Sequence, residues 1–582
     1  MHIYKFFSKF ARENRSGCGP GRLCSGKSNK KNIKSTMKHL LLGDEAIALG
    51  AIDAGLSGVY AYPGTPSTEI TEYIQRVESQ KQKVESCRDG SVGGCAAGAE
   101  PIQCRWATNE KTAMEAALGM SYMGKRALVC MKHVGMNVCA DAFMNAAITG
   151  VNGGLVVVAA DDPSMHSSQN EQDSRFYAEF AMIPCFEPSN QQEAYDMTRS
   201  AFDYSEQIHK PVLLRVTTRM AHSRAVVQTA EVRPQNALSF PEDVKHFILL
   251  PAFAKKNYAE LVALQPSLVC HSDESGHNSY LRGSNPKKAI IACGIGYNYL
   301  MENGTPSASV LKITEYPLPE GLIRQMIADG AEEVLVIEEG QPVVEQAIKR
   351  FIPSEVAVKG RLTGALPRIG ELHPEDVAKA LSLPLPQRRE ADPLVVPRPP
   401  AMCMGCGHRD MYTALNEVAR EYEQARIFGD IGCYTLGALS PFHAIHACVE
   451  MGASVTMAKG AADAGQYPSI AVIGDSTFTH SGMTGLLDCV NSNADVVVLI
   501  SDNLTTGMTG GQDSAGTGRL EAICKGLGVA EDHVRVVVPL PKNIAAIKTV
   551  LREEINYHGV SVVIARRECI QTLKRHHKST KQ

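Results

Sequence analysis

The stretch SIAVIGDSTFTHSGMTGLLDCVNSNADVVVLISDN, residues 469–503, contains two apolar runs that flank a segment with helical spacing. The runs 470–473 and 496–500 are short enough to be buried strands. From Ser481 onward apolar side chains recur at helical intervals, after a predicted N-cap at Thr479 or Ser481. A strand, a helix and a second strand in this order predict a βαβ unit with two parallel strands.

Polar residues follow both predicted strands at their carboxyl ends. Gly474-Asp475-Ser476 follows the first strand, and Asp502-Asn503 follows the second. This edge of an open α/β sheet is where ligands bind, and a carboxylate with an amide oxygen suits Mg2+, which also keeps phosphate oxygens and water. We therefore predict a diphosphate clamp in which Asp475 and Asn503 bind Mg2+. In the alternative interpretation these two residues only terminate their strands.

The same spacing resembles the thiamine-diphosphate-binding motif, in which GD(G/S) is followed about 25–30 residues later by a terminal Asn. By this resemblance, Gly474, Asp475, Ser476 and Asn503 bind the cofactor. The resemblance also implies a third Mg2+ contact from the backbone carbonyl two residues further on, at Thr505.

Length and composition indicate a large, soluble, multidomain enzyme. The 582 residues exceed what one core accommodates, and 44% hydrophobic with 21% charged residues is typical of a globular protein. A net charge of −3 gives no electrostatic basis for binding nucleic acid or an anionic membrane, and no apolar run reaches the roughly 18 residues of a transmembrane helix. The 17 cysteines are scattered through helix-like and strand-like segments, which predicts a reducing, cytoplasmic compartment.

Residues 1–36 differ in composition from the rest of the chain. They contain nine Lys or Arg residues and one acid, Glu13, among many Gly, Ser and Asn residues. A basic, acid-poor segment is typical of a transit peptide, but a coherent domain begins at once from Met37. We expect residues 1–36 to be a disordered leader, or to precede the true start at Met37. A secretory signal is not expected, because an apolar core of about 7–15 residues is missing near the start.

Residues 37–225 are predicted to form an α/β domain with a parallel sheet. Its strand candidates are short, apolar and β-branched: 59–62, 127–131, 155–160 and 212–216. The turn after the first of them, in YPGTPST, resembles the YP-x-TPS turn of 2-oxoacid:ferredoxin oxidoreductases. In that family the threonine matching Thr65 faces the carboxylate of the 2-oxoacid. Alternatively, Thr65 and Ser67 cap the helix that comes next.

The segment WATNEK, residues 106–111, leads into a predicted helix. In one interpretation Glu110 is a first-turn acid that favours the positive end of the helix. In the other, Asn-Glu at a helix start resembles the pyrimidine-domain glutamate of thiamine enzymes. A carboxylic acid in an apolar pocket hydrogen-bonds the aminopyrimidine ring and promotes the imino tautomer that generates the reactive carbon. With Asp475 and Asn503 in the same chain, we favour a catalytic Glu110 in a pyrimidine-binding domain.

The rest of the chain divides further. Residues 226–285 show weak periodicity and are predicted to be an irregular connection. Residues 286–383 resemble the transketolase C-terminal-like domain of thiamine enzymes. Six prolines at 384–400 predict an extended linker without a helix, which leads into the diphosphate-binding domain, 401–582. The predicted fold therefore has two doubly wound parallel-sheet domains and a smaller α/β domain.

Two cysteine motifs stand near the start of the last domain. Cys403 and Cys406 form a C-x-x-C, and Cys433 lies in GDIGCY. A C-x-x-C alone is compatible with zinc, redox or incidental roles, although no second C-x-x-C completes a zinc site. The order resembles the small subunit of 2-oxoacid:ferredoxin oxidoreductases, where these cysteines hold a [4Fe–4S] cluster beside the thiamine ring. The resemblance implies that Gly432 and Cys433 contact the cofactor, and leaves Cys524 as the fourth cluster ligand.

The motifs YPGTPST, WATNEK, HSSQNEQDSR, MCMGCGHR, GDIGCYTLG and GDSTFTHSGMTGL together span nearly the whole chain after Met37. The ordered set resembles the alpha (large) subunits of indolepyruvate:ferredoxin oxidoreductases. The resemblance implies oxidative decarboxylation of arylpyruvates to aryl-acyl-CoA, with coenzyme A as substrate and electrons passed to ferredoxin. It also implies a smaller beta subunit in a dimer of heterodimers. The alternatives are a non-oxidative thiamine-dependent decarboxylase or carboligase, and a non-catalytic regulatory subunit.

The C-terminal sequence departs from the pattern of this family. Its alpha subunits commonly end in a ferredoxin-like domain with C-x2-C-x2-C-x3-C runs, whereas this sequence ends RRECIQTLKRHHKSTKQ with Cys569 alone. We therefore expect electrons to leave through the site of Cys403, Cys406 and Cys433 or through a cluster of the partner.

Overall fold

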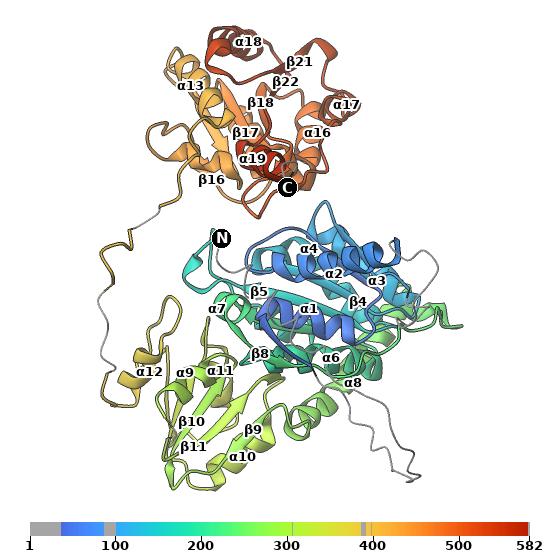
Figure 1. The fold of residues 1–582 in the computed structure, drawn as a ribbon, viewed down its shortest axis with the longest axis vertical. Coiled ribbons are helices and arrows are strands. Elements are labelled where there is room, and N and C mark those ends of the chain that lie inside the picture. The colour runs from blue at the N-terminus through green and yellow to red at the C-terminus, as the bar shows by residue number, and fades with distance from the viewer. Residues whose placement is uncertain (1–36, 87–99, 305, 386–390, 397–398, 580–582) are drawn as a thin grey trace, which may run out of the picture. The chain divides into compact units, whose positions relative to one another are not determined.

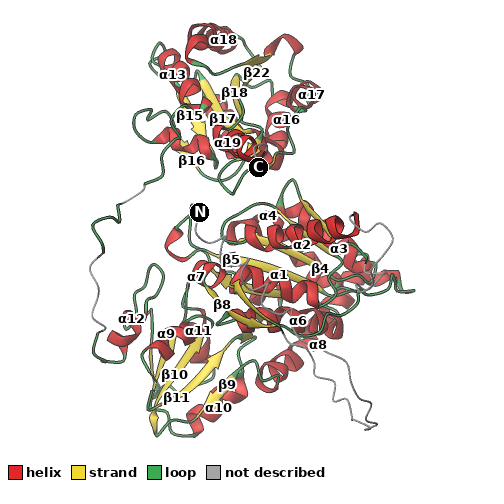
Figure 2. Ribbon diagram, viewed as in Figure 1, coloured by secondary structure: helices red, strands yellow, loops and turns green. Residues whose placement is uncertain are grey.

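The structure, a computed structural model, describes residues 37–86, 100–304, 306–385, 391–396 and 399–579. The chain divides into the units Met1–Met37 and Lys38–Gln582, and every described helix and strand belongs to the second. The predicted leader, 1–36, lies outside the described residues. Among those residues, mainly parallel sheets flanked by helices confirm the predicted α/β class (Figures 1 and 2). No helix of this part of the chain is both long and apolar enough to span a membrane.

The first sheet has seven strands within the described residues. They are β2 (Gly58–Ala61), β3 (Gln103–Trp106), β4 (Ala127–Lys132), β5 (Leu155–Asp161), β6 (Cys185–Phe186), β7 (Val212–Thr217) and β12 (Glu315–Tyr316). Their order is β12-β6-β7-β5-β4-β2-β3, and all neighbours are parallel except β12 and β6. The four runs predicted as strands are the contiguous strands β2, β4, β5 and β7, which confirms the prediction of a parallel sheet.

Helices cover both faces of this sheet because its central strands are apolar on both sides. In β5, Val156 and Val158 belong to one hydrophobic core, while Val157 and Ala159 belong to the other. The first core contains residues of α1 (Gly43–Asp53), α2 (Thr68–Ser86) and α6 (Gln191–Ile208). The second contains residues of α3 (Glu110–Tyr122) and α4 (His133–Thr149). Alternation along each strand thus supplies two cores from one sheet.

A two-stranded ribbon joins the start of the domain to its end. β1 (Lys38–Leu42) pairs antiparallel with β8 (Arg224–Gln228), with Leu42 opposite Arg224. β1 runs directly into α1, and β8 comes after the short helix α7 (Thr218–His222). The ribbon therefore places the first turn of α1 beside the last turn of α7.

The second sheet is formed mainly by the segment predicted as a smaller domain, 286–383. Its described strands are β9 (Ser279–Leu281), β10 (Asn285–Cys293), β11 (Ala308–Ile313), β13 (Glu333–Ile337) and β14 (Ala357–Lys359), in the order β14-β13-β10-β11-β9, with β9 antiparallel. β9 and the first residue of β10 precede the predicted segment. The first core includes residues of α9 (Gly296–Glu302) and α12 (Pro374–Ala380), and the second includes residues of α10 (Glu320–Ala328) and α11 (Val343–Ala347). Residues of 286–383 also form β12, so this segment contributes one strand to the first sheet.

The connection 226–285, predicted to be irregular, contains the helix α8 (Pro251–Glu274) as well as β9. The buried residues of α8 are Asn257, Leu261, Leu268 and Ser272. Their spacing is helical, but half of them are polar, and Pro266 lies inside the helix. The apolar pattern that reveals a helix in a sequence is therefore weak here, and the prediction of an irregular segment was wrong for 251–274.

The third sheet forms the C-terminal part of the described chain. It contains β15 (Arg426–Gly429), β16 (Ala447–Cys448), β17 (Ser469–Gly474), β18 (Val496–Asp502), β21 (Val534–Val537) and β22 (Val560–Arg566). All neighbours are parallel, in the order β16-β15-β17-β18-β22-β21. α13 (Gly407–Ala419) and α18 (Ile544–Asn556) pack on one face, and α14 (Ala453–Asp463), α16 (Met483–Asn491) and α17 (Leu520–Gly526) on the other. β17 and β18 are parallel neighbours, as predicted for 469–503.

The helix between β17 and β18 begins earlier than predicted. Helical backbone starts with α15 (Asp475–Thr477), continues through a π-helical turn over Phe478–Gly482 and enters α16. The predicted N-cap at Thr479 or Ser481 was wrong, because this polar run lacks the apolar periodicity that marks a helix. Single π-helical turns within α-helices are frequent at functional sites.

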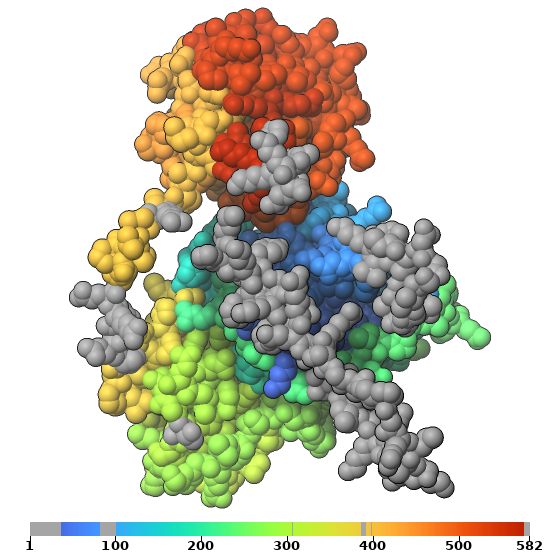
Figure 3. Space-filling model, in the orientation of Figure 1, coloured from blue at the N-terminus to red at the C-terminus, as the bar shows by residue number. Residues whose placement is uncertain are grey.

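Of the predicted linker, 384–400, the structure describes residues 384–385, 391–396 and 399–400. These residues form neither helix nor strand, and all of them are exposed (Figure 3). Leu394 is 88% exposed, so this segment contributes little to a core.

Candidate active site

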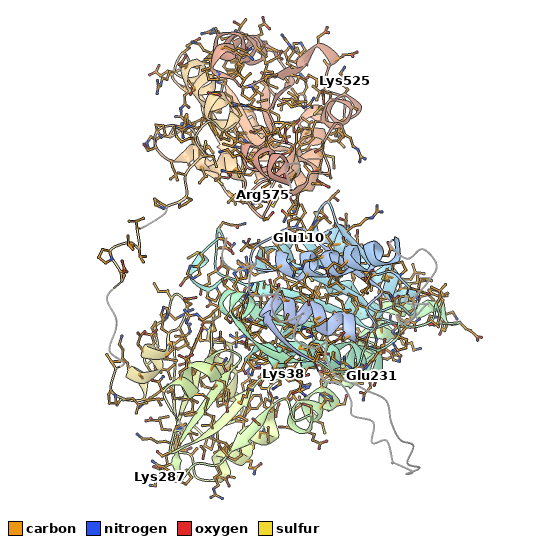
Figure 4. All side chains as sticks on the ribbon, in the orientation of Figure 1. Lys38, Glu110, Glu231, Lys287, Lys525 and Arg575 are labelled. Carbon is orange, nitrogen blue, oxygen red and sulfur yellow. The ribbon has the colours of Figure 1, made fainter. Side chains whose placement is uncertain are left out.

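The residues predicted to bind cofactor and substrate line one pocket. They are Thr65, Glu110, Gly432, Cys433, Gly474, Asp475, Ser476, Asn503 and Thr505. Thr65 follows β2, Glu110 begins α3 (labelled in Figure 4), and the others follow β15, β17 and β18. Carboxyl ends of parallel strands from two sheets therefore present their polar residues to the same cavity, as expected for a ligand site of open α/β sheets.

Two glycines allow the pocket wall to pack closely. A Cβ at Gly474 would lie 2.6 Å from Cε1 of Tyr434, and a Cβ at Gly432 would overlap the same ring. Tyr434 is buried, and its hydroxyl bonds to the carboxylate of Asp430. The ring is therefore held in place, and only glycine fits at positions 432 and 474. At these two positions no side chain covers the backbone, so a ligand in the pocket would approach the backbone directly.

Asp475 presents a buried oxygen without a hydrogen bond. The residue is 2% exposed, and its Oδ2 has no hydrogen-bond partner among the described residues. Burial, and then the negative charge of Asp502, raise the pKa of Asp475 to about 7. Asp502 itself has a cation, since Nε of Arg566 lies 2.6 Å from its Oδ2. A buried carboxylate that lacks such a partner fits a site for a bound cation.

Asn503 and Thr505 lie in a tight turn after β18. Leu504 between them has a φ of 61°, in the left-handed region, and the N–H of Thr505 donates to Oδ1 of Asn503 at 3.1 Å. The N–H of Cys569 donates to the carbonyl of Asn503 at 3.1 Å. With Asp475, this turn provides carboxylate, amide and carbonyl oxygens, the hard donors that Mg2+ takes together with phosphate oxygens. The donor set and the bare glycine backbone thus fit a metal-bound diphosphate.

The PGTPST turn is closed by hydroxyls other than that of Thr65. Oγ of Ser67 donates to the carbonyl of Gly64 at 2.8 Å, and the N–H of Gly64 donates to Oγ1 of Thr68 at 3.1 Å. Thr65 instead lines the pocket. Lys132, which ends β4, lines it as well, and burial lowers the pKa of its amine. Nothing in the sequence assigned Lys132 a role, because a lysine that follows a strand is usually exposed to solvent.

Glu110 bonds to a residue that sequence reasoning passed over. Nε2 of His480 lies 2.8 Å from Oε2 of Glu110, and the two residues are 4% and 5% exposed. Nδ1 of His480 lies 2.6 Å from Oγ of Ser481, and its ring meets Tyr62 edge-on with centroids 4.7 Å apart. Nδ2 of Asn109 donates to the carbonyl of His480 at 2.9 Å. Both nitrogens and the backbone of this histidine are therefore held.

The π-helical turn and a glycine make this contact possible. His480 lies within the π-helical turn, so its direction differs from the one an ordinary helix would give it. On the other side, a Cβ at Gly135 would lie 2.7 Å from Cγ of Glu110, and glycine leaves room for the carboxylate. The histidine stands in the motif GDSTFTHSGMTGL, but no periodicity in the sequence indicates the irregular turn that directs it.

Cys569 joins the thiols of Cys403, Cys406 and Cys433. Burial raises the pKa of Cys433 to about 12, and the charges of Cys569, Cys406 and Cys403 act in the same direction. Burial raises the pKa of Cys406 as well, and the charges of Cys403 and Cys569 act in the same direction. Thiols influence one another in this way only at short range. Nε2 of Gln571, in α19 (Ile570–Ser579), lies 3.3 Å from Sγ of Cys403, which brings the C-terminal helix to the C-x-x-C loop.

The structure does not bring Cys524, the predicted fourth cluster ligand, to this group. Cys524 is buried in α17, where burial and the charge of Glu521 raise its pKa to about 12. Figure 4 shows Lys525 of α17 well separated from Arg575 of α19, the helix next to Cys569. Cys569, by contrast, follows β22, the strand that pairs with β18.

Two protein families match the chain. The family described as pyruvate flavodoxin/ferredoxin oxidoreductase, thiamine-diphosphate-binding, matches residues 49–276. The C-terminal thiamine-pyrophosphate-binding domain of thiamine pyrophosphate enzymes matches residues 430–565. The two matches include the seven-stranded sheet except β12 and most of the six-stranded sheet, which together carry the pocket residues.

Individual relatives extend the similarity to nearly the whole chain. The indolepyruvate oxidoreductase subunit IorA of Archaeoglobus fulgidus is 39% identical over 564 residues, covering 91% of this chain and 86% of that protein. The subunit of the same name from Pyrococcus abyssi is 36% identical over 581 residues, covering 91% and 85%. The 2-oxoglutarate synthase subunit KorA of Methanothermobacter marburgensis is 23% identical over 392 residues, covering 59% and 97%. Given the identity and the coverage of the first two, this chain belongs to the IorA family of indolepyruvate oxidoreductase subunits, within the thiamine-diphosphate-dependent 2-oxoacid oxidoreductases.

Proposed function

We propose that this chain is the catalytic subunit of an enzyme that oxidatively decarboxylates arylpyruvates of the indolepyruvate type. The product is the aryl-acyl-CoA, and the electrons pass to ferredoxin. Membership of the IorA family supports this reaction, and the observation that carries it is the pocket where Glu110, Asp475 and Asn503 converge. A regulatory subunit without activity would have no use for this set. The proposal includes a smaller beta subunit, in a dimer of heterodimers.

The pocket fits thiamine diphosphate with Mg2+. Asp475, Asn503 and the carbonyl of Thr505 would bind Mg2+, and the backbone at Gly432–Cys433 and Gly474–Ser476 would contact the cofactor. When bound, the cofactor supplies a nucleophilic carbon for the 2-oxo group and accepts the electrons left by CO2. The unpaired Oδ2 of Asp475 is the structural support for the cation.

Glu110 and His480 would work as a pair in this reaction. Glu110 would exchange a proton with the aminopyrimidine ring as that ring changes tautomer. His480 is a positioning residue: if its Nε2–H donates to Oε2 of Glu110, its Nδ1 accepts from the hydroxyl of Ser481, which sets one neutral tautomer. This hydrogen bond orients the Glu110 carboxylate and leaves Oε1 for the cofactor.

Thr65 and Lys132 are proposed to bind the carboxylate of the 2-oxoacid. Both line the pocket, and Nζ of Lys132 donates to the carbonyl of Ser167 at 2.8 Å, which directs the amine. An ammonium and a hydroxyl are suitable donors to a carboxylate. Val134, Met451 and Met508 also line the pocket, and such apolar side chains suit an aryl group.

Cys403, Cys406, Cys433 and Cys569 are proposed to bind a [4Fe–4S] cluster. Four thiolates are the number that such a cluster takes, and the effect of Cys403 and Cys569, added to that of burial, on the pKa values of Cys406 and Cys433 supports a common site. Cys433 also lines the pocket. These residues would therefore hold the cluster next to the pocket, where it would supply one-electron redox chemistry.

The function is tested with the chain co-expressed with its beta subunit and purified anaerobically. We expect indolepyruvate and phenylpyruvate to reduce ferredoxin or a viologen dye only when coenzyme A is present, with pyruvate much less active. Release of the aryl aldehyde and CO2 without reduction of an acceptor would instead identify a non-oxidative decarboxylase. Absence of any turnover despite bound thiamine diphosphate would exclude the catalytic role.

Asp475→Ala should abolish Mg2+-dependent binding of thiamine diphosphate, measured by isothermal titration calorimetry. The metal-free variant should unfold at no lower temperature than the parent protein, because the substitution removes a buried carboxylate oxygen that has no partner. Asp488→Ala is the matched control, since Asp488 lies in the same βαβ unit and its side chain is 64% exposed. Unchanged affinity in Asp475→Ala would refute the clamp.

Glu110→Gln should bind the cofactor nearly normally and lose about 10²–10⁴-fold in exchange of the thiazolium C2 proton, followed by NMR. His480→Ala should slow this exchange by about 10–100-fold, the effect of losing a hydrogen bond to a charged group. His480→Gln restores a donor near Nε2 and should recover most of the rate. If His480→Ala exchanges at the parental rate, the Glu110–His480 bond has only a structural role.

Cys569→Ser should lower iron content and ferredoxin reduction while CO2 release in a single turnover persists. The reason is that the electrons lose their exit after decarboxylation has occurred. Cys524→Ser is the control and should keep both the iron and the reduction rate. The opposite result, with iron lost in Cys524→Ser and retained in Cys569→Ser, would restore Cys524 as the fourth ligand.

A further inference from the structure

A second group of metal-ligating side chains lies apart from the residues that line the pocket. It consists of Asp44 in the first turn of α1, Glu69 in the first turn of α2, and His222, the last residue of α7. One ligand atom of each lies within 4.8 Å of those of the other two. Nε2 of His222 is 3.6 Å from Oε2 of Glu69. Among the described residues, no other His, Cys, Asp or Glu side chains gather so closely in threes.

Four polar atoms of this group have no hydrogen-bond partner within the described part of the chain. Asp44 is 0% exposed, and neither of its carboxylate oxygens has a hydrogen-bond partner among the described residues. The same holds for Oε2 of Glu69 and Nε2 of His222. An acid in the first turn of a helix ordinarily accepts from the free N–H groups there, and Asp44 does not. Since buried polar groups are normally paired, these convergent orphan atoms indicate a missing ligand.

The fold places Asp44 and His222 close together. The N–H of Gly43 donates to the carbonyl of Ser223 at 3.2 Å, so the first turn of α1 is bonded to the residue after α7. A Cβ at Gly43 would overlap the carbonyl oxygen of Met220, and glycine therefore permits this approach. Asp44 and His222 are thus placed by the backbone of two helices that the β1–β8 ribbon brings together.

Among the described residues, Asp44 has no lysine or arginine partner, and its nearest charges are negative. Burial raises the pKa of Asp44 well above its usual range, and the charges of Glu69 and Glu45 act in the same direction. Glu45 has its own partners, since it accepts from the N–H of Leu42 and from Arg76, each at 3.0 Å. His222 is the one basic group of the triad, and it faces two carboxylates. A divalent cation would neutralise both.

We propose that Asp44, Glu69 and His222 bind a divalent transition-metal ion, with water in its remaining positions. An imidazole with two carboxylates suits Zn2+, Fe2+ or Co2+ better than Ca2+ or Mg2+, which take oxygen ligands. Metal–ligand bonds of about 2.0–2.2 Å require only small side-chain rotations to close the set. The side chains of His222 and Glu69 are 34% and 37% exposed, so ion and water have access. The ion joins the starts of α1 and α2 to the end of α7, and α2 begins at the turn that carries Thr65.

Co2+ is the probe, because its d–d absorption reports nitrogen and oxygen ligands and a charge-transfer band reports thiolates. The protein is first saturated with Mg2+ and thiamine diphosphate to occupy the pocket. Spectra of the parent protein and of Asp44→Asn are then subtracted. Co2+ bound by the cysteines contributes equally to both spectra and cancels in the difference. We expect the parent to bind one Co2+ per chain more than the variant, without a thiolate band in the difference. Its unfolding temperature should rise with Co2+ or Zn2+, because the ion binds the folded state.

Three variants separate metal binding from misfolding. Asp44→Asn and His222→Ala should lose the metal-dependent rise in unfolding temperature. Metal-free Asp44→Asn should unfold at or above the parental temperature, because an amide removes the buried charge. Glu45→Gln, with the same charge change one residue away at a paired carboxylate, should keep the extra Co2+. Equal Co2+ stoichiometry in the parent and Asp44→Asn, or an unfolding temperature that Co2+ and Zn2+ leave unchanged, would overturn the proposal in favour of a proton shared by Asp44 and Glu69.

Discussion

The hydrogen bond between Glu110 and His480 joins residues that are 370 positions apart, and the pocket depends on it. Glu110 begins α3 beside the seven-stranded sheet, and His480 lies in the π-helical turn after β17 of the six-stranded sheet. Both residues are buried, and a buried polar group left unpaired costs about 1–3 kcal/mol. Asn109 and Tyr62 hold the same histidine from the side of α3 and β2. These contacts keep the strand ends of both sheets facing one cavity.

Other buried charged residues in the described chain have a structural role. Arg215 is 0% exposed and bonds to Asp161 at 2.6 Å and to Glu187. Arg175 reaches Glu338, at the end of β13, at 2.9 Å. These networks link the seven-stranded and five-stranded sheets, and each charge has an opposite partner, as a buried ion requires. Asp475 and Asp44 differ because their carboxylates have no such partner, which distinguishes a ligand site from scaffold.

The pairing of β18 with β22 connects the pocket to the cysteine group. Asn503 follows β18, and the N–H of Cys569, after β22, bonds to the Asn503 carbonyl. One edge of one sheet therefore positions both the proposed Mg2+ ligands and a thiol that lies near Cys433. In the proposed reaction, decarboxylation and electron removal would take place side by side, because parallel strands end at the same level. The short C-terminal helix α19 adds the contact of Gln571 with Cys403.

The sequence by itself determined the α/β class and six strands of the two larger sheets, and its resemblance to thiamine enzymes added the nine predicted residues that line the pocket. The strands result from local features, since short apolar runs form buried parallel strands and polar residues after them gather at one edge. The helix α8 was not predicted from the sequence, because half of its buried residues are polar. Only the tertiary structure revealed the positions of His480 and Cys569 and the triad of Asp44, Glu69 and His222. A π-helical turn, a strand pairing and a two-stranded ribbon bring these residues to their neighbours, and such contacts between distant segments leave no periodicity in the sequence.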